Sequence, residues 1–251
     1  MEVINERVGE KYTNKVGDTA TIITYRSSLD VDVQFQDGTI IKNIPYHNIK
    51  RRSFRNLNSP SVGTFGFLGY GKYTPTIDKK ISKTYKLWEA MLRRCYDLKI
   101  QNRVNTYIGC ETVKEWHNFQ VFAKWAEENY DPITMEKWQL DKDILVKGNK
   151  VYGPNTCCFV PPTVNSLLLK SDKVRGEYPL GVRKLGNVYQ SRLFKDRVYF
   201  HLGSFKTPEE AFQAYKVAKE EYIKEVAEKW KDQIDPKVYQ ALYNYKVEIT
   251  D

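Results

Sequence analysis

The segment Gly181–Lys219, GVRKLGNVYQSRLFKDRVYFHLGSFKTPEEAFQAYKVAK, decides the fold of the C-terminal part of the chain. It contains three runs in which apolar and polar residues alternate, a spacing typical of half-buried strands. Thr207, Pro208 and Glu210 then mark the start of a helix, because they supply an N-cap, a first-turn proline and a negative charge. The segment therefore predicts a three-stranded antiparallel sheet with a helix packed against one face.

A sheet that is backed by one helix leaves its other face open to a partner. A period of two predicts that this face carries Arg183, Arg192 and His201, together with Lys195 or Arg197. A cationic sheet face can enter the major groove of DNA, where arginine pairs with guanine edges. We therefore expect double-stranded DNA as the partner. The predicted DNA-binding residues are Arg183, Lys184, Tyr189, Arg192, Lys195, Arg197 and His201.

The same segment resembles an AP2 domain. The resemblance is carried by the Gly-Val-Arg start, the strand with an aromatic residue, the Leu-Gly-x-Phe run and Thr-Pro-Glu-Glu-Ala at the helix start. It implies DNA binding by the sheet, with Arg183 in the place of the family's base-contacting arginine. His201 stands where the family usually has tryptophan, so the resemblance implies no base preference.

The segment Leu140–Asn165, LDKDILVKGNKVYGPNTCCFVPPTVN, bears a second set of chemical groups. A nuclease that uses one divalent cation needs a carboxylate, a second oxygen ligand and a general base. In order and spacing this segment resembles the HNH nucleases of the phage homing type. The resemblance implies a ββα-metal core in which Asp141 and Asn165 hold Mg²⁺ or Mn²⁺ and Asn155 braces the loop. The implied catalytic residues are Lys142, Asp143 and Asn155.

Lys142 stands where the family has its catalytic histidine. A protonated lysine cannot accept a proton from water, although it could stabilise charge on a phosphate; Asp143 or His117 could act as the base instead. Two alternatives follow. One is an HNH-like endonuclease that cleaves or nicks DNA, and the other is an inactive HNH-derived protein that binds DNA or regulates. A third alternative is an interaction protein that binds a host factor through acidic or aromatic surfaces.

The rest of the chain predicts further elements. Alternating runs around an Asp37-Gly38 hairpin turn predict a small curled sheet or barrel. Two aromatic stripes at helical spacing predict helices packed into a core, one through Trp88 and one through Trp116 and Phe119. The predicted fold class is α+β. The predicted parts are a small β-rich module at 1–56, a linker or arm at 57–80, an HNH-like ββα core with its preceding helices at 81–170, a polar linker at 170–178, and an AP2-like DNA-binding domain with a C-terminal helix at 178–251. The lysines of the arm could follow a phosphate backbone.

Composition limits the partners and the compartment. The 251-residue chain has a formal net charge of +9 and a pI near 9.1, which suits an anionic partner. It has no apolar run long enough to cross a membrane and no apolar signal core, so we expect a cytoplasmic protein, in the host cytoplasm if a phage encodes it. The four cysteines form no CxxC pair and are expected to be reduced, buried thiols. The sequence does not indicate an oligomeric state.

Overall fold

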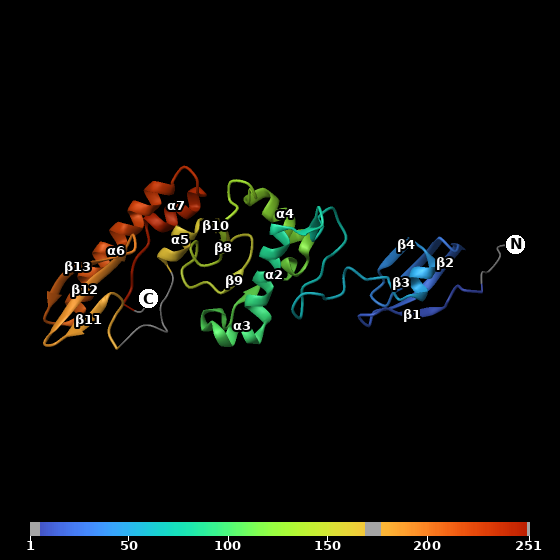
Figure 1. Cartoon of the computed structure of the whole chain (residues 1–251), viewed down its shortest axis with the longest axis horizontal. Coiled ribbons are helices and arrows are strands. Elements are labelled where there is room, and N and C mark those ends of the chain that lie inside the picture. The colour runs from blue at the N-terminus through green and yellow to red at the C-terminus, as the bar shows by residue number, and fades with distance from the viewer. Residues whose placement is uncertain (1–5, 169–176, 250–251) are drawn as a thin grey trace. The chain divides into compact units, whose positions relative to one another are not determined.

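The computed structural model describes residues 6–168 and 177–249 and shows a mixed α+β chain (Figure 1). The chain divides into two compact units, the first formed by residues 1–108 and 112–126 and the second by residues 109–111 and 127–251. The predicted central range 81–170 contributes to both units. The predicted linker at 170–178 falls largely outside the described residues.

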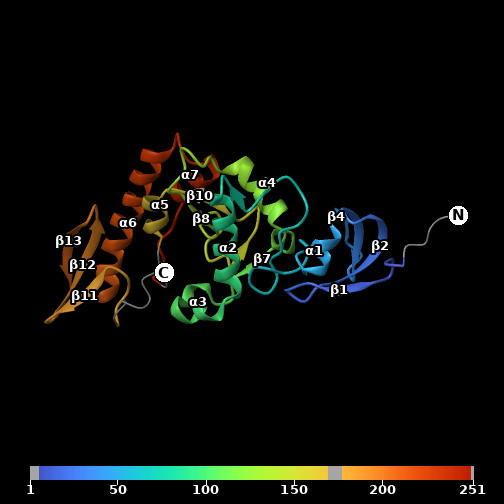
Figure 2. The same cartoon turned by 45° about the vertical axis from the view of Figure 1, so that its right-hand side comes forward.

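The first unit begins with a four-stranded antiparallel sheet, as the alternating runs predict, and its strands lie in the order β1-β2-β3-β4. Figure 2 shows this sheet next to the short helix α1. Gly38 has a φ of +85° in the turn between β3 and β4, a conformation that glycine adopts without strain. Ile22 of β2 and Val31 and Val33 of β3 are fully buried, and their side chains form one core with Ile49 of the short helix α1. The elements are β1 (Lys11–Thr13), β2 (Thr19–Ser27), β3 (Asp30–Phe35), β4 (Ile40–Ile44) and α1 (Tyr46–Lys50).

The remainder of the first unit is mainly helical. Ser82 caps helix α2 by accepting a hydrogen bond from the backbone N–H of Tyr85, and Trp88 and Met91 are fully buried, as the helical stripe predicts. Trp116 is buried too, but it lies in a 3-10 turn, so the second predicted helix begins only at Phe119. The elements are β5 (Thr76–Ile77), β6 (Lys80–Ile81), α2 (Lys83–Tyr96), α3 (Leu98–Arg103), η1 (Asn105–Tyr107), β7 (Glu111–Thr112), η2 (Lys114–His117) and α4 (Phe119–Asn129). One boundary between the two units in the sequence falls within β7, between Glu111 and Thr112.

The first part of the second unit contains three short strands followed by a short helix. Strand β8 pairs antiparallel with β10, and Asp141 lies opposite Cys158 in the register. Helix α5 follows β10 directly and has Pro162 in its first turn. All four cysteines of the chain are free and buried, as the sequence predicts. The elements are β8 (Gln139–Asp141), β9 (Val151–Tyr152), β10 (Cys158–Val160) and α5 (Pro162–Leu167).

The C-terminal part has the three antiparallel strands and the covering helix that the sequence predicts (Figure 1). Thr207 and Glu210 form a capping box at the start of α6. Gly181 lets the helix approach the first strand, because a Cβ at that position would overlap the ring of Tyr215. The elements are β11 (Val182–Leu185), β12 (Val188–Lys195), β13 (Val198–Phe205), α6 (Pro208–Trp230) and α7 (Pro236–Tyr243). No helix among the described residues is long and apolar enough to cross a membrane.

Candidate functional site

The sheet β11–β12–β13 has one covered face and one open face. Ser191 and Leu193 of β12 are buried on the side that packs against α6. Their neighbours Gln190, Arg192 and Phe194 consequently point to the opposite side, because successive side chains of a strand alternate between the two faces. Cross-strand pairing places Arg183 beside Gln190, His201 beside Arg192, and Tyr199 beside Phe194. These six residues form what we call the open face.

Side-chain contacts hold the cations of the open face in place. Both Nε and Nη2 of Arg183 donate hydrogen bonds to Oε1 of Gln190, at 3.0 and 2.8 Å. The guanidinium carbon of Arg192 lies 5.1 Å from the centre of the Tyr199 ring, close enough for a cation–π contact. Two arginines are therefore fixed in orientation on an exposed surface, which reduces the entropy that a partner must remove on binding.

Aromatic rings that normally avoid water are exposed beside these arginines. Tyr199 is 65% exposed and Phe194 is 52% exposed, and their ring centres are 4.7 Å apart. The sequence prediction did not include Gln190, Phe194 or Tyr199. Alternation alone places Gln190 and Phe194 on the same side as Arg192, and it places Tyr199 on the same side as His201, two residues along β13. The register between β12 and β13 then brings Tyr199 opposite Phe194.

The other predicted DNA-binding residues lie elsewhere on the C-terminal sheet. The ammonium group of Lys195 forms an ion pair with Glu225 of α6, which places this lysine on the helix side. Lys184 and Tyr189 pair with each other across β11 and β12, one position out of phase with the open face, and the Lys184 ammonium lies 5.7 Å from the Tyr189 ring centre. Arg197 occupies the tip of the hairpin between β12 and β13, with φ at +67°. The structure thus brings Arg183, Arg192 and His201 together on one face and places the remaining four residues outside it.

A second candidate site lies on the strands β8 and β10 and on α5. The Oδ1 atom of Asp141 accepts hydrogen bonds from the backbone N–H groups of Asp143 and Ile144, both at 2.8 Å. The Nδ2 atom of Asn165 donates to Oε1 of Gln139 at 2.5 Å. Because Gln139 and Asp141 are two residues apart on one strand, they share a face, and Asn165 lies on that face too. The two predicted metal ligands are therefore on the same side of the strand pair.

The electrostatics of this site favour a positive partner for Asp141. Burial, together with the nearby negative charge of Asp143, raises the pKa of its carboxyl group to about 6, while backbone N–H groups and Lys142 act in the opposite direction. A carboxylate and an amide oxygen are hard donors of the kind that Mg²⁺ and Mn²⁺ prefer. Among residues 6–168 and 177–249, no group of three or more His, Cys, Asp or Glu side chains is placed to hold a metal. A cation held by only these two oxygen donors would keep most of its ligands as water, as Mg²⁺ does.

Lys142 lies directly after the end of β8, and its side chain is buried. Its Nζ lies 3.3 Å from Oδ2 of Asp143 and 5.9 Å from the centre of the Tyr152 ring. Asp143 itself is accessible, with 45% of its side chain exposed. The lysine is therefore positioned to hold the carboxylate of Asp143.

His117, the other candidate for the base, belongs to the first compact unit. Its ring stacks on Phe65, and its Nε2 is 3.2 Å from the hydroxyl oxygen of Tyr96. Burial lowers the pKa of this imidazole, and the positive charge of Lys114 lowers it further. These contacts give His117 a packing environment within its own unit.

Asn149 braces the loop between the two strands of the second site. Its Nδ2 donates to the backbone carbonyls of Lys142 and Val151, both at 2.7 Å, so that it ties the end of β8 to β9. Asn155, for which bracing was predicted, is exposed on the turn before β10. The sequence reasoning missed Asn149, although the Gly148-Asn149 turn is a signal that could have identified it.

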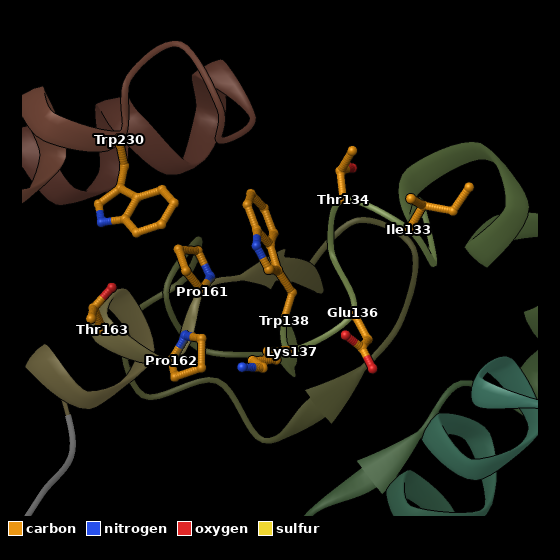
Figure 3. Close-up of a pocket in the computed structure, with 9 residues that line it drawn as sticks. All are labelled: Ile133, Thr134, Glu136, Lys137, Trp138, Pro161, Pro162, Thr163 and Trp230. Atoms are coloured by element: carbon orange, nitrogen blue, oxygen red, sulfur yellow. The ribbon is translucent and has the colours of Figure 1, made fainter.

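An open pocket of about 390 Å³ lies beside the start of α5 (Figure 3). The rings of Trp138 and Trp230 meet edge to face within it, with centres 6.3 Å apart. Pro161 and Pro162 form part of its wall, and Thr163 follows them on the helix that carries Asn165. The tryptophan pair links the end of α6 to the residue before β8, so the open face and the Asp141 site belong to one packed unit.

No family model, curated protein or solved structure matches this chain. The functional assignment therefore depends on the residues and geometry described above.

Proposed function

We propose that this protein binds double-stranded DNA through the open face of β11–β13, as the resemblance to AP2 domains implies. The observation that carries the proposal is the pair of oriented arginines, Arg183 and Arg192, among exposed aromatic rings. Fixed guanidinium groups can make bidentate hydrogen bonds with guanine edges, and the adjacent rings can contact thymine methyl groups. The net charge of +9 supplies the attraction to phosphates that nucleic-acid binding requires.

The second part of the proposal is that the Asp141 site cleaves or nicks the bound DNA, as in the HNH nucleases that Leu140–Asn165 resembles. Two antiparallel strands followed by a helix give the order of elements that a ββα core has. Asp141 and Asn165 would hold one Mg²⁺ or Mn²⁺, which when bound supplies a Lewis acid at the scissile phosphate. Asp143 is the accessible carboxylate beside them, and Lys142 orients it.

A specific observation favours a second candidate function, a DNA-binding protein without nuclease activity. The chain has only three histidines, and none of them lies on β8, β10 or α5. The carboxylate of Asp143, the remaining candidate for a base at this site, is already engaged by the ammonium group of Lys142. In this case the ββα elements serve as a scaffold for DNA binding.

One experiment separates these functions. Purified protein is incubated with a mixed pool of supercoiled plasmids and Mg²⁺ or Mn²⁺, beside Asp141→Ala and a matched control, Asp232→Ala, at an exposed position. Nicks that disappear only in Asp141→Ala support the nuclease. Tight, salt-sensitive binding without any nicks supports the non-catalytic function. If the protein shows no salt-sensitive binding to any duplex, both parts of the proposal are wrong, and the interaction protein becomes the better account.

A further inference from the structure

The small hairpin β5–β6 has a strained tip. The register pairs Ile77 with Lys80, so the turn between the strands consists of Asp78 and Lys79 alone. Both residues have positive φ, +48° and +63°. A two-residue turn of this kind favours Asn-Gly or Asp-Gly, because a side chain in the left-handed region is strained. Lys79 occupies the position where glycine would relieve that strain.

Both faces of this hairpin are open to solvent. Cross-strand pairing places Thr76 and Ile81 on one face and Ile77 and Lys80 on the other. All four residues are exposed, and the two isoleucines are 61% and 54% exposed. A lone two-stranded hairpin is marginally stable at best. Neither the strained tip nor the exposed isoleucines therefore stabilises the free protein.

The same tip chemistry recurs on the sheet that we propose to bind DNA. The turn between β12 and β13 consists of Asp196 and Arg197, again with positive φ at both residues, +51° and +67°. In each turn a basic side chain takes the position that favours glycine. The surroundings of the first turn are cationic as well, since residues 72–86 contain five lysines and a single acidic residue, Asp78.

We propose that the β5–β6 ribbon enters the major groove of the DNA duplex. This inference rests on the proposed DNA-binding function. The major groove is wide enough to admit a two-stranded β-ribbon, and a ribbon in a groove needs both of its faces open. Lys79 at the tip contacts a backbone phosphate, and Ile77 or Ile81 contacts thymine methyl groups at the base edges. Burial in the groove removes the isoleucines from water.

The test compares three variants in the full chain. Lys79→Gln removes the charge and keeps the strained turn, Lys79→Gly removes both, and Lys99→Gln is a matched control at an exposed lysine on α3. Affinity for a duplex selected from a random pool is measured against salt concentration. Both Lys79 variants are expected to bind about three- to tenfold more weakly and to reduce the salt slope by about one unit, whereas Lys99→Gln binds as the wild type does. Lys79→Gly alone is expected to slow amide hydrogen exchange in the hairpin, by about fivefold.

A second readout locates the ribbon on the DNA. Guanine N7 lies in the major groove, so protection of this atom from methylation reports groove occupancy. Ile77→Thr and Lys79→Gly are expected to lose protection at the same few guanines, while Arg192→Ala loses it at others. The Lys79 variants could match the wild type in affinity, salt slope and N7 protection while Arg192→Ala still weakens binding. In that case the β5–β6 ribbon does not contact DNA and this inference is wrong, but the proposed function stands. If the wild type does not bind duplex DNA, the proposed function itself has failed.

Discussion

Replacing Asp141 with asparagine should stabilise the metal-free protein at neutral pH. The pKa of this carboxyl group is raised from 3.8 to about 6, so the folded state holds its proton more tightly than the unfolded state. The wild type consequently loses stability as the pH rises from about 4 to about 6, and a shift of about two pKa units corresponds to about 3 kcal/mol at pH 7. Asparagine has no charge to desolvate, and its Oδ1 can still accept the two backbone hydrogen bonds.

The assay is urea unfolding of the wild type, Asp141→Asn and the exposed control Asp232→Asn between pH 4 and pH 8, without divalent metal. The stability advantage of Asp141→Asn should be near zero at pH 4 and should grow to about 2–3 kcal/mol by pH 7, while the control follows the wild type. Millimolar Mg²⁺ or Mn²⁺ should then stabilise the wild type and leave Asp141→Asn unchanged, because a ligand stabilises only the state that binds it. An advantage that is absent, or that does not change with pH, would show that Asp141 is not an electrostatically strained carboxylate.

Three further predictions follow from individual contacts. Arg183→Ala should weaken DNA binding by about 1–3 kcal/mol and relax discrimination at one base pair, as measured by selection from a random duplex pool; an unchanged preference would remove the open face as the reading surface. Asn149→Ala should lower the free energy of unfolding by about 1–3 kcal/mol in a urea titration, because two backbone carbonyls lose their donor. The control Asn155→Ala, at an exposed position, should change it by less than about 0.5 kcal/mol, and equal effects would contradict the bracing role of Asn149. Arg197→Gly should stabilise the C-terminal hairpin by about 0.5–1 kcal/mol in hydrogen exchange and yet weaken DNA binding, and an unaltered affinity would mean that the strained tip does not contact DNA.

Local chemistry explains why so much of the fold could be predicted from the sequence. The start of α6 was predicted because Thr207, Pro208 and Glu210 act within one turn, and the structure shows the capping box that they form. The helical stripe through Trp88 and Met91 was predicted because burial at a period of 3.6 leaves a clear pattern. Alternation likewise gave the strands of the C-terminal sheet and placed Arg183 and Arg192 on one face.

The features that were missed depend on contacts between distant residues. Lys195 has the same alternation signal as its neighbours, but its partner Glu225 is 30 residues away on α6, and only the packing of the helix reveals the ion pair. The burial of Lys142 beside Tyr152 depends on where β9 lies. Asn149 and Asn155 both follow glycine-containing turns, and only the fold shows that the first braces β8 and β9. The 3-10 turn at Lys114–His117 carries the same aromatic spacing as a helix, so the pattern could not distinguish the two.

The central claim is that the open face of β11–β13 binds DNA, and the most direct test is fluorescence anisotropy of a labelled duplex titrated with protein at several salt concentrations. The wild type is compared with a double variant, Arg183→Ala with Arg192→Ala, and with Lys99→Gln as the control. We predict that the logarithm of the wild-type affinity falls linearly with the logarithm of salt concentration, and that the double variant loses at least about tenfold in affinity and shows a shallower slope. A double variant that binds with the affinity and salt slope of the wild type would contradict the assignment of DNA binding to this face.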